Sequence, residues 1–362
     1  MYLHIVDVIQ VMKTVYILGA GFSRDWEPSK FPLVRDFFQI ARTTGAINQD
    51  DYDKDLNSYI HKFFHTVEGA DLEKVMCFLS IPPFNASLSA KTERLNYYSK
   101  LIKVITNVLQ NAHHKASREE VQNLYTKFID KAVSEQSIII SFNYDLLVDT
   151  LLHKTGLWCG YDGYSIEIPS VYQALPKPAR VSKGIYNPDK RSKTYLLKLH
   201  GSINWGTATH NPSENKSIFQ EAGGYYFKDY KNGVNGPSII SSPEVTSITD
   251  LPLRLNFEPY IIPPILDKSS FINGNEVKLL WKIARDAIAK ATQIIFIGYS
   301  LPPTDFMAEF LFRSSFVDKP PKDIEVINKS ISEEMKSRYG SLSPLKEVTY
   351  TEKTFADWAK SI

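Results

Sequence analysis

The feature that most constrains the fold is a series of short apolar runs, each of which ends in glycine or in polar residues. The run 16–18 precedes a Gly-Ala-Gly turn, the run 138–140 precedes a serine, and the run 195–199 precedes a histidine. Runs of this length and composition are typical of β-strands. In an open α/β sheet, ligands bind outside the carboxyl ends of the strands. We therefore expect the functional residues in the loops that follow these runs.

His200 follows the third run, within the sequence Leu-Lys-Leu-His-Gly-Ser-Ile-Asn-Trp. An imidazole, with an ordinary pKa of about 6.5, can accept or donate a proton near neutral pH. Because this histidine stands at the end of an expected strand, we interpret it as a catalytic residue. A half-buried histidine with a purely structural role is the alternative.

The Gly-Ala-Gly turn contains Gly19 and Gly21, which let backbone amides approach a pyrophosphate, and Ser23 adds a hydroxyl donor. Arg24 stands where the dinucleotide-binding fingerprint has its third glycine, and no acidic residue ends a second strand about twenty residues later. An ordinary dehydrogenase is therefore disfavoured. Arg24 could pair with a phosphate or form an exposed salt bridge. The turn itself could be a tight strand-to-helix connection without a ligand.

Asn143 and Asp145 follow the second run, in the sequence Ser-Phe-Asn-Tyr-Asp. Their spacing of two predicts that both side chains project from one loop toward the same crevice. The alternative is that one of them caps the helix that the leucines at 146, 147 and 151 predict.

Taken in order, these segments resemble the sirtuin-like superfamily, whose pattern is Gly-Ala-Gly-x-Ser, then Thr/Ser-x-Asn-x-Asp, then His-Gly. The matching residues here are 19–23, 141–145 and 200–201. Two further blocks resemble the family's later strands, Ile-Ile-Phe-Ile-Gly-Tyr-Ser-Leu-Pro at 294–302 and Glu-Val-Ile-Asn at 325–328. The blocks extend over most of the chain, with unmatched insertions between them.

The chain departs from the protein deacylase branch of that superfamily. Those enzymes usually carry a zinc module of four cysteines, whereas this chain has only Cys77 and Cys159, so we expect neither zinc nor another metal site. The sequences LHGSINW and IGYSLPPTD instead resemble bacterial sirtuin-like NAD hydrolases, which often belong to antiphage systems that deplete the infected cell of NAD. The resemblance thus implies NAD as the substrate and cleavage of its nicotinamide–ribose bond to nicotinamide and ADP-ribose.

The resemblance also assigns roles to residues. Asn143 would position the ribose or the attacking water, His200 would act as the base, and Asp145 would contact the nicotinamide amide or steer the ribose. The implied NAD-binding residues are Gly19, Ala20, Gly21, Phe22, Ser23 and Arg24 at the pyrophosphate, Gly201 beside the catalytic histidine, Gly298 and Ser300 on the adenosine ribose side, and Asn328 at the adenosine ribose or adenine. An NAD-dependent protein deacylase and a non-catalytic sensor of NAD or ADP-ribose are the alternatives. A cyclase that makes cyclic ADP-ribose also stays open, because it breaks the same bond.

Composition fits a soluble, cytoplasmic enzyme. Lys and Arg number 42 against 40 Asp and Glu, a net charge of +2, so no overall field favours nucleic acid or a membrane surface. The apolar start of the chain includes Asp7 and lacks a basic segment, which argues against a signal peptide, and we hypothesise that Met12 is the true start. An unregulated NAD hydrolase would poison its host. We therefore expect a homo-oligomer, or a regulatory partner protein that senses infection.

We predict one catalytic domain, 12–362, of the α/β class, with a Rossmann-like, doubly wound and mainly parallel sheet. Its core comprises 12–44, 136–155, 194–205 and 275–362, with a helical insertion at 45–135 and a loop- and hairpin-rich segment at 156–265 around the site. Apolar residues at helical spacing, such as Leu72, Val75, Met76 and Leu79, predict the helices of the insertion. We interpret Asp71 and Glu73 as acidic residues that favour the start of one of these helices.

Overall fold

The computed structural model describes residues 12–45, 51–67, 69–80, 87–112, 118–158, 160, 162–165, 170–175, 180–183, 192–209, 225–228, 237–238, 256–262, 275–317, 321, 323–342 and 347–362. Residues 1–11, Cys159 and much of the predicted segment 156–265 lie outside this part of the chain. The predicted division into a core, a helical insertion and a loop-rich segment stays a prediction.

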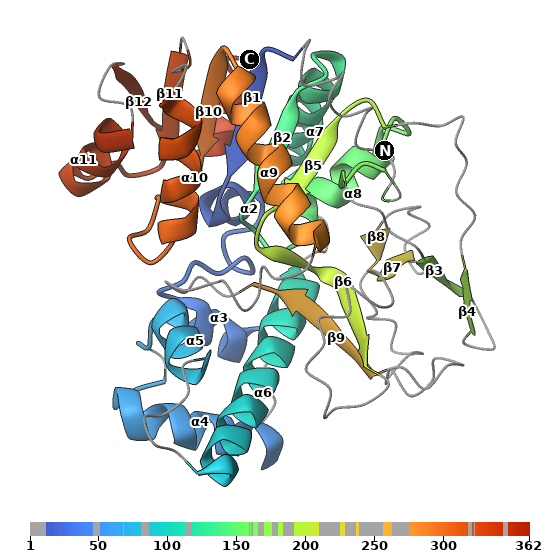
Figure 1. Ribbon diagram of the computed structural model, residues 1–362, viewed down its shortest axis with the longest axis vertical. Coiled ribbons are helices and arrows are strands. Elements are labelled where there is room, and N and C mark those ends of the chain that lie inside the picture. The colour runs from blue at the N-terminus through green and yellow to red at the C-terminus, as the bar shows by residue number, and fades with distance from the viewer. Residues whose placement is uncertain are drawn as a thin grey trace.

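A six-stranded sheet, in which every neighbouring pair is parallel, forms the centre of the protein (Figure 1). Its strand order is β12-β11-β10-β1-β2-β5. The strands are β1 (Thr14–Leu18), β2 (Ile138–Ser141), β5 (Tyr195–Lys198), β10 (Gln293–Ile297), β11 (Asp323–Asn328) and β12 (Val348–Glu352). The chain adds β2 and β5 on one side of β1 and later returns to add β10, β11 and β12 on the other. The predicted fold class, an α/β Rossmann-like sheet wound in both directions, is confirmed.

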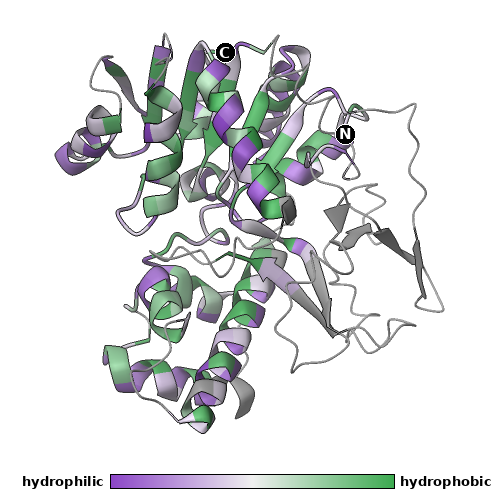
Figure 2. Cartoon of the chain, in the orientation of Figure 1, coloured by the Kyte–Doolittle hydropathy of each residue, from purple (hydrophilic) through white to green (hydrophobic). Residues whose placement is uncertain are grey.

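The strands are apolar because helices cover both faces of the sheet. Val15, Ile17 and Ile138–Ile140 are completely buried. Figure 2 shows the hydrophobic residues concentrated on the central strands, whereas the surrounding helices alternate hydrophobic and hydrophilic residues. On one face of the sheet, α10 (Phe306–Phe316) packs against both α9 (Asn275–Lys290) and α11 (Glu333–Leu342). A second group of helices that contact one another comprises α2 (Ala20–Trp26), α7 (Glu119–Ser134), α8 (Leu147–Lys154) and α12 (Phe355–Ala359).

The remaining helices form a lobe below the carboxyl edge of the sheet in the view of Figure 1. They are α3 (Phe37–Thr43), α4 (Asp51–Phe64), α5 (Leu72–Ser80) and α6 (Leu88–Ala112). Helix α7 follows them in the chain but packs on the core, where Phe128 meets Tyr16 of β1 edge to face at 4.9 Å between ring centroids. Within the described residues, no helix is both long and apolar enough to cross a bilayer.

Two smaller sheets lie beside the end of β5. Strand β6 (Gly201–Thr209) pairs with β9 (Asn256–Ile261) in an antiparallel ribbon. A second sheet, in the order β4-β3-β7-β8, consists of β3 (Ser170–Leu175), β4 (Arg180–Lys183), β7 (Tyr225–Lys228) and β8 (Pro237–Ser238). The ribbon begins directly after His200, so it helps to fix the end of β5.

Candidate active site

The carboxyl ends of β1, β2, β5 and β10 lie at one edge of the parallel sheet and gather four of the five predicted blocks. The direction of winding reverses between β1 and β10, which is the position where open α/β sheets bind ligands. The loops after these strands are joined to each other by hydrogen bonds, which define how the site residues lie.

The glycine turn after β1 is packed directly against the loop after β10. Gly21 N donates to Gly298 O at 2.9 Å, and Gly19 N donates to Ile297 O at 3.0 Å. A Cβ at Gly19 would lie 2.5 Å from the Cα of Tyr299, and Gly298 has a φ of 61°. These glycines are therefore required for backbone contact between the two loops. In this arrangement the Gly21 amide is already engaged by the chain itself.

Asn143 ties the loop after β2 to the same turn. Its Nδ2 donates to Gly19 O at 2.9 Å and to Ser23 Oγ at 3.1 Å. Because a backbone carbonyl can only accept, the amino group of Asn143 must face the turn, and its Oδ1 faces the opposite way. None of the described residues donates a hydrogen bond to this Oδ1.

Asp145 is buried and turned toward the protein interior. Its Oδ1 accepts the amide proton of Leu147 at 3.0 Å, at the start of α8, and a second hydrogen bond connects the carboxylate with Ser23. Burial raises the pKa of Asp145, while Lys198, the Leu147 amide and Ser23 act in the opposite direction. The contact ties the carboxylate to the first turn of α8, close to the capping alternative, although the N-cap residue of the helix is Leu146. Ser23 thus joins Asn143 and Asp145 into one network.

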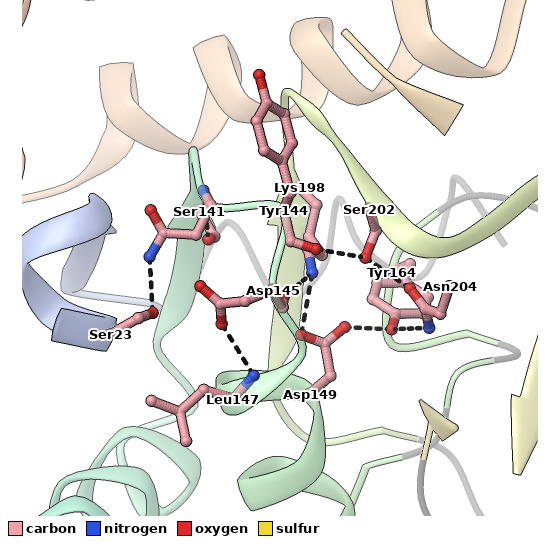
Figure 3. Close-up of polar contacts among 11 residues, drawn as sticks. Ser23, Ser141, Tyr144, Asp145, Leu147, Asp149, Tyr164, Lys198, Ser202 and Asn204 are labelled. Carbon is pink, nitrogen blue, oxygen red and sulfur yellow. Dashed lines mark hydrogen bonds and ion pairs between the residues drawn. The ribbon is translucent and has the colours of Figure 1, made fainter. Parts of the chain in front are cut away.

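Lys198 holds the same loop from the end of β5, as Figure 3 shows. Its Nζ donates to the backbone carbonyl of Asp145 and pairs with Asp149 Oδ2 at 3.1 Å. The hydroxyl of Tyr164 donates to the other carboxylate oxygen of Asp149, and Asn204 Nδ2 donates to Tyr164 at 3.1 Å. Lys198 is not among the predicted site residues, although a lysine inside an apolar run is a signal that it has a buried partner.

His200 pairs with Asp305, a residue that the sequence analysis also missed. The two side chains are both buried, and Nε2 of His200 lies 3.2 Å from Oδ2 of Asp305. Tyr299 donates its hydroxyl proton to the same oxygen at 2.7 Å. The ring of Tyr299 stacks on Phe142 at 4.5 Å, and Phe142 meets His200 edge to face at 4.9 Å. Since Phe142 precedes Asn143, this ring contact brings the histidine next to the asparagine loop.

Glu73 reaches this region from the helical lobe. Its carboxylate accepts a hydrogen bond from the hydroxyl of Thr304, next to Asp305. The pKa of Tyr299 is raised well above its usual value, mainly by burial and by Asp305, and Glu73 contributes. Asp71 accepts from the amide of Lys74 at 3.1 Å, as expected for the start of α5. Glu73, in contrast, contributes negative charge beside the His200 pair, which its position at a helix start did not predict.

The other predicted residues lie at or near this edge, with different partners. Gly201 has a φ of 78°, and a Cβ there would lie 2.2 Å from Tyr260 O, so the position requires glycine for backbone contact. Ala20 begins α2, whereas the side chain of Phe22 packs into the core against Tyr125 and Phe355. The backbone of Phe22 is also engaged within the chain, because its amide donates to Gly19 O at 2.9 Å and its carbonyl accepts from the hydroxyl of Tyr125.

Arg24, Ser300 and Asn328 lie outside the Asn143–His200 cluster. Arg24 pairs with Asp36 at 2.9 Å and donates to Phe31 O at 2.7 Å, which is the salt-bridge alternative. Ser300 is exposed and its carbonyl accepts from Arg338. Asn328 ends β11, and its carbonyl accepts from the amide of Lys353. The described residues include no group of three or more His, Cys, Asp or Glu that could hold a metal ion.

No protein-family model and no curated protein matches the chain. Its structure is similar to solved Sir2 structures. A Sir2 homologue in complex with NAD is 11% identical, with 99% of this chain and 91% of that chain covered and a TM-score of 0.42. A mutant Sir2 homologue in complex with 2'-O-acetyl ADP ribose is 11% identical, with coverages of 99% and 93% and a TM-score of 0.45. Values this low indicate a distant likeness, so the function has to be inferred from the chain's own residues.

Proposed function

We propose that the chain binds NAD at the carboxyl edge of the sheet and cleaves its nicotinamide–ribose bond with water, giving nicotinamide and ADP-ribose. The observation that supports this most is the His200–Asp305 pair beside the Asn143 loop. It combines a potential general base with an amide oxygen at the strand ends where an α/β sheet binds nucleotides.

Cleavage of the nicotinamide–ribose bond requires few catalytic groups beyond the His200–Asp305 pair and Asn143. The nicotinamide ring is cationic while it is bonded to the ribose, and it leaves as a neutral molecule with the electron pair of that bond. The reaction therefore needs a stabilised, positively charged ribose and an activated water rather than strong acid catalysis. In this proposal His200 accepts a proton from the water or from a ribose hydroxyl, and Asn143 Oδ1 accepts a hydrogen bond from one of them. The carboxylates of Asp305 and Glu73 favour the positive charge that develops on the ribose. The contacts of Asp145 favour a supporting role in the loop.

The dinucleotide would lie over the point where the winding reverses, above the contact between the turn after β1 and the loop after β10. In this proposal Gly19, Ala20, Gly21 and Ser23 would border the dinucleotide on one side and Gly298 and Ser300 on the other, with Asn328, at the end of the next strand, on the adenosine side. Because the Gly21 amide is engaged by Gly298, the pyrophosphate contacts must come from other groups of the turn. The glycines would therefore serve the backbone contact between the two loops as much as the binding of the dinucleotide.

The test is release of nicotinamide and ADP-ribose from NAD by the purified protein, alone and with the products of neighbouring genes. His200→Ala and Asn143→Ala should abolish the release, whereas Asp323→Asn, at the opposite end of β11, should not. Release that depends on an acetyl-lysine peptide would instead identify a deacylase. Binding of NAD without cleavage under every condition would contradict the hydrolase and favour a sensor.

We also propose that the enzyme acts in antiphage defence and that self-association contributes to its control. Phe306, Phe310 and Val317 of the α10 region are 54%, 57% and 77% exposed, and at about 3.6 residues per turn they fall on one helical face. Glu309 and Arg313, which form an ion pair at 2.8 Å, border that face. If α10 of a second copy of the chain packed antiparallel on this face, Phe306 would meet an apolar residue of that copy. Glu309 and Arg313 would each meet the opposite charge of the other copy.

The two charges allow a direct test of this contact. Sedimentation velocity should show that the wild-type protein self-associates, that E309R and R313E each weaken the association, and that an equimolar mixture of the two variants restores it. Association that is insensitive to both variants would place the contact elsewhere, and a monomeric wild-type protein would contradict the proposal.

A further inference from the structure

The proposed cleavage uses the charge of Asp305 but does not explain why this carboxylate lies directly against His200. It is 1% exposed, directly precedes α10, and contacts a histidine at the end of a different strand, β5. Leaving a carboxylate buried at this position is costly unless its charge is used or compensated. Its contacts therefore indicate a specific role toward His200.

The carboxylate of Asp305 is held in place from several sides. Tyr299 donates to Oδ2, and the backbone amide of Asp305 donates to Pro302 O at 2.9 Å in the preceding turn. Tyr299 is fixed in turn by its stacking on Phe142 and by the hydroxyl of Tyr339, which donates to Tyr299 O at 2.7 Å. These contacts fix the carboxylate before any ligand binds.

A fixed carboxylate at Nε2 determines the state of the imidazole. It favours the neutral tautomer that has its proton on Nε2 and its lone pair on Nδ1, and it stabilises the imidazolium that forms when the ring accepts a proton. We propose that Asp305 is a positioning residue for His200, which sets the ring's orientation, tautomer and basicity without touching the substrate. This inference rests on the proposed function only for its consequence in catalysis.

Other ionisable groups face the pair, so the test must separate their effects from that of Asp305. Tyr299 contacts Asp305 directly, Tyr144 lies 6.3 Å from His200 between ring centroids, and Glu73 approaches through Thr304. The contact of Asp305 with the imidazole is direct, at 3.2 Å between Oδ2 and Nε2.

The experiment is NMR of the protein with isotope-labelled histidine rings, assigned by comparison with His200→Ala and carried out without NAD. In the wild-type protein the ring ¹⁵N shifts of His200 should show the Nε2–H tautomer at high pH. The His200 pKa should fall by about one unit in Asp305→Asn and in Asp305→Ser, and stay unchanged in Asp323→Asn, because only the first two remove the neighbouring charge. In Glu73→Gln the change should be smaller.

An Nδ1–H tautomer in the wild-type protein, or an unchanged His200 pKa in either folded Asp305 variant, would overturn the inference. None of these readouts depends on NAD turnover, so they separate this inference from the proposed reaction. If NAD is cleaved, kcat should fall about 10²-fold in Asp305→Asn with KM nearly unchanged. The acid limb of the kcat/KM profile should also move to lower pH, because the base would remain neutral there.

Discussion

Two charged clusters lie two residues apart in the chain, at the end of the same strand, and they differ in what their charges do. Lys198 is 1% exposed, and its ammonium is compensated by the carboxylate of Asp149 and a backbone carbonyl. His200 is 4% exposed, and its partner Asp305 comes from the loop after β10, at the edge of the sheet. The Lys198 cluster thus fastens one loop to the core, whereas the His200 pair places an imidazole at the edge of the sheet where we propose that NAD binds. Burial alone does not distinguish a structural charge from one that we propose to be catalytic.

The largest effect should come from breaking the Lys198 cluster. Lys198→Met leaves Asp149 charged and buried, and should lower the free energy of unfolding by about 3–5 kcal/mol. The double variant Lys198→Met/Asp149→Asn removes both charges and should recover part of that loss. Urea denaturation measures both variants. Equal losses in the single and double variants would show that packing, rather than the unpaired charge, causes the destabilisation.

His200→Gln should show the opposite behaviour, with a large effect on activity and a small one on stability. Glutamine keeps a polar side chain of similar length but cannot serve as the base, so NAD cleavage should fall about 10²–10⁴-fold. The free energy of unfolding should change by about 1 kcal/mol, within the common range for a single substitution. If His200→Gln lowered the free energy of unfolding as much as Lys198→Met, the His200 pair would also be a stabilising cluster, and the proposed difference between the two would be wrong.

Asp145 lies between the two clusters, and its burial should make the free energy of unfolding depend on pH. Its pKa is raised in the folded chain, mainly by burial, so the folded state holds the proton more tightly than the unfolded state. Stability is therefore lost as the pH rises from the unfolded pKa through the folded one. In Asp145→Asn this loss is absent, and the variant should gain stability relative to wild type as the pH rises above the ordinary pKa of an aspartate, about 3.9. A difference in unfolding free energy that stays constant above this pH would contradict the raised pKa.

The sheet could be predicted from the sequence because each strand is a local signal. The runs 16–18, 138–140 and 195–199 are apolar and β-forming, and burial on both faces of a parallel sheet requires such runs. The ends of these runs also gave Asn143 and His200. The distances that bring Asn143 to the glycine turn, and His200 to Asp305, depend on strand order, which no local pattern specifies.

The residues that sequence reasoning missed acquire their roles only through tertiary contacts. Asp305 looks like the start of a helix, Glu73 looks like an acidic residue that favours a helix start, and Lys198 looks like an interruption of an apolar strand. Each has its main partner on another element, more than forty positions away along the chain in every case. Asp145 contacts the start of α8, close to the capping role that the sequence left as an alternative, but the N-cap residue is Leu146.

The smallest effect is expected at Arg24, where the structure shows a surface ion pair. Arg24→Ala and Asp36→Asn both break this pair, and each should lower the free energy of unfolding by about 0.2–1 kcal/mol, because the partners are partly exposed. Only Arg24→Ala removes the cation next to the glycine turn. If the arginine serves the ion pair alone, both variants keep the KM for NAD of the wild-type protein. A raised KM in Arg24→Ala, with Asp36→Asn unchanged, would show that the arginine leaves Asp36 to bind a phosphate and would extend the site to α2.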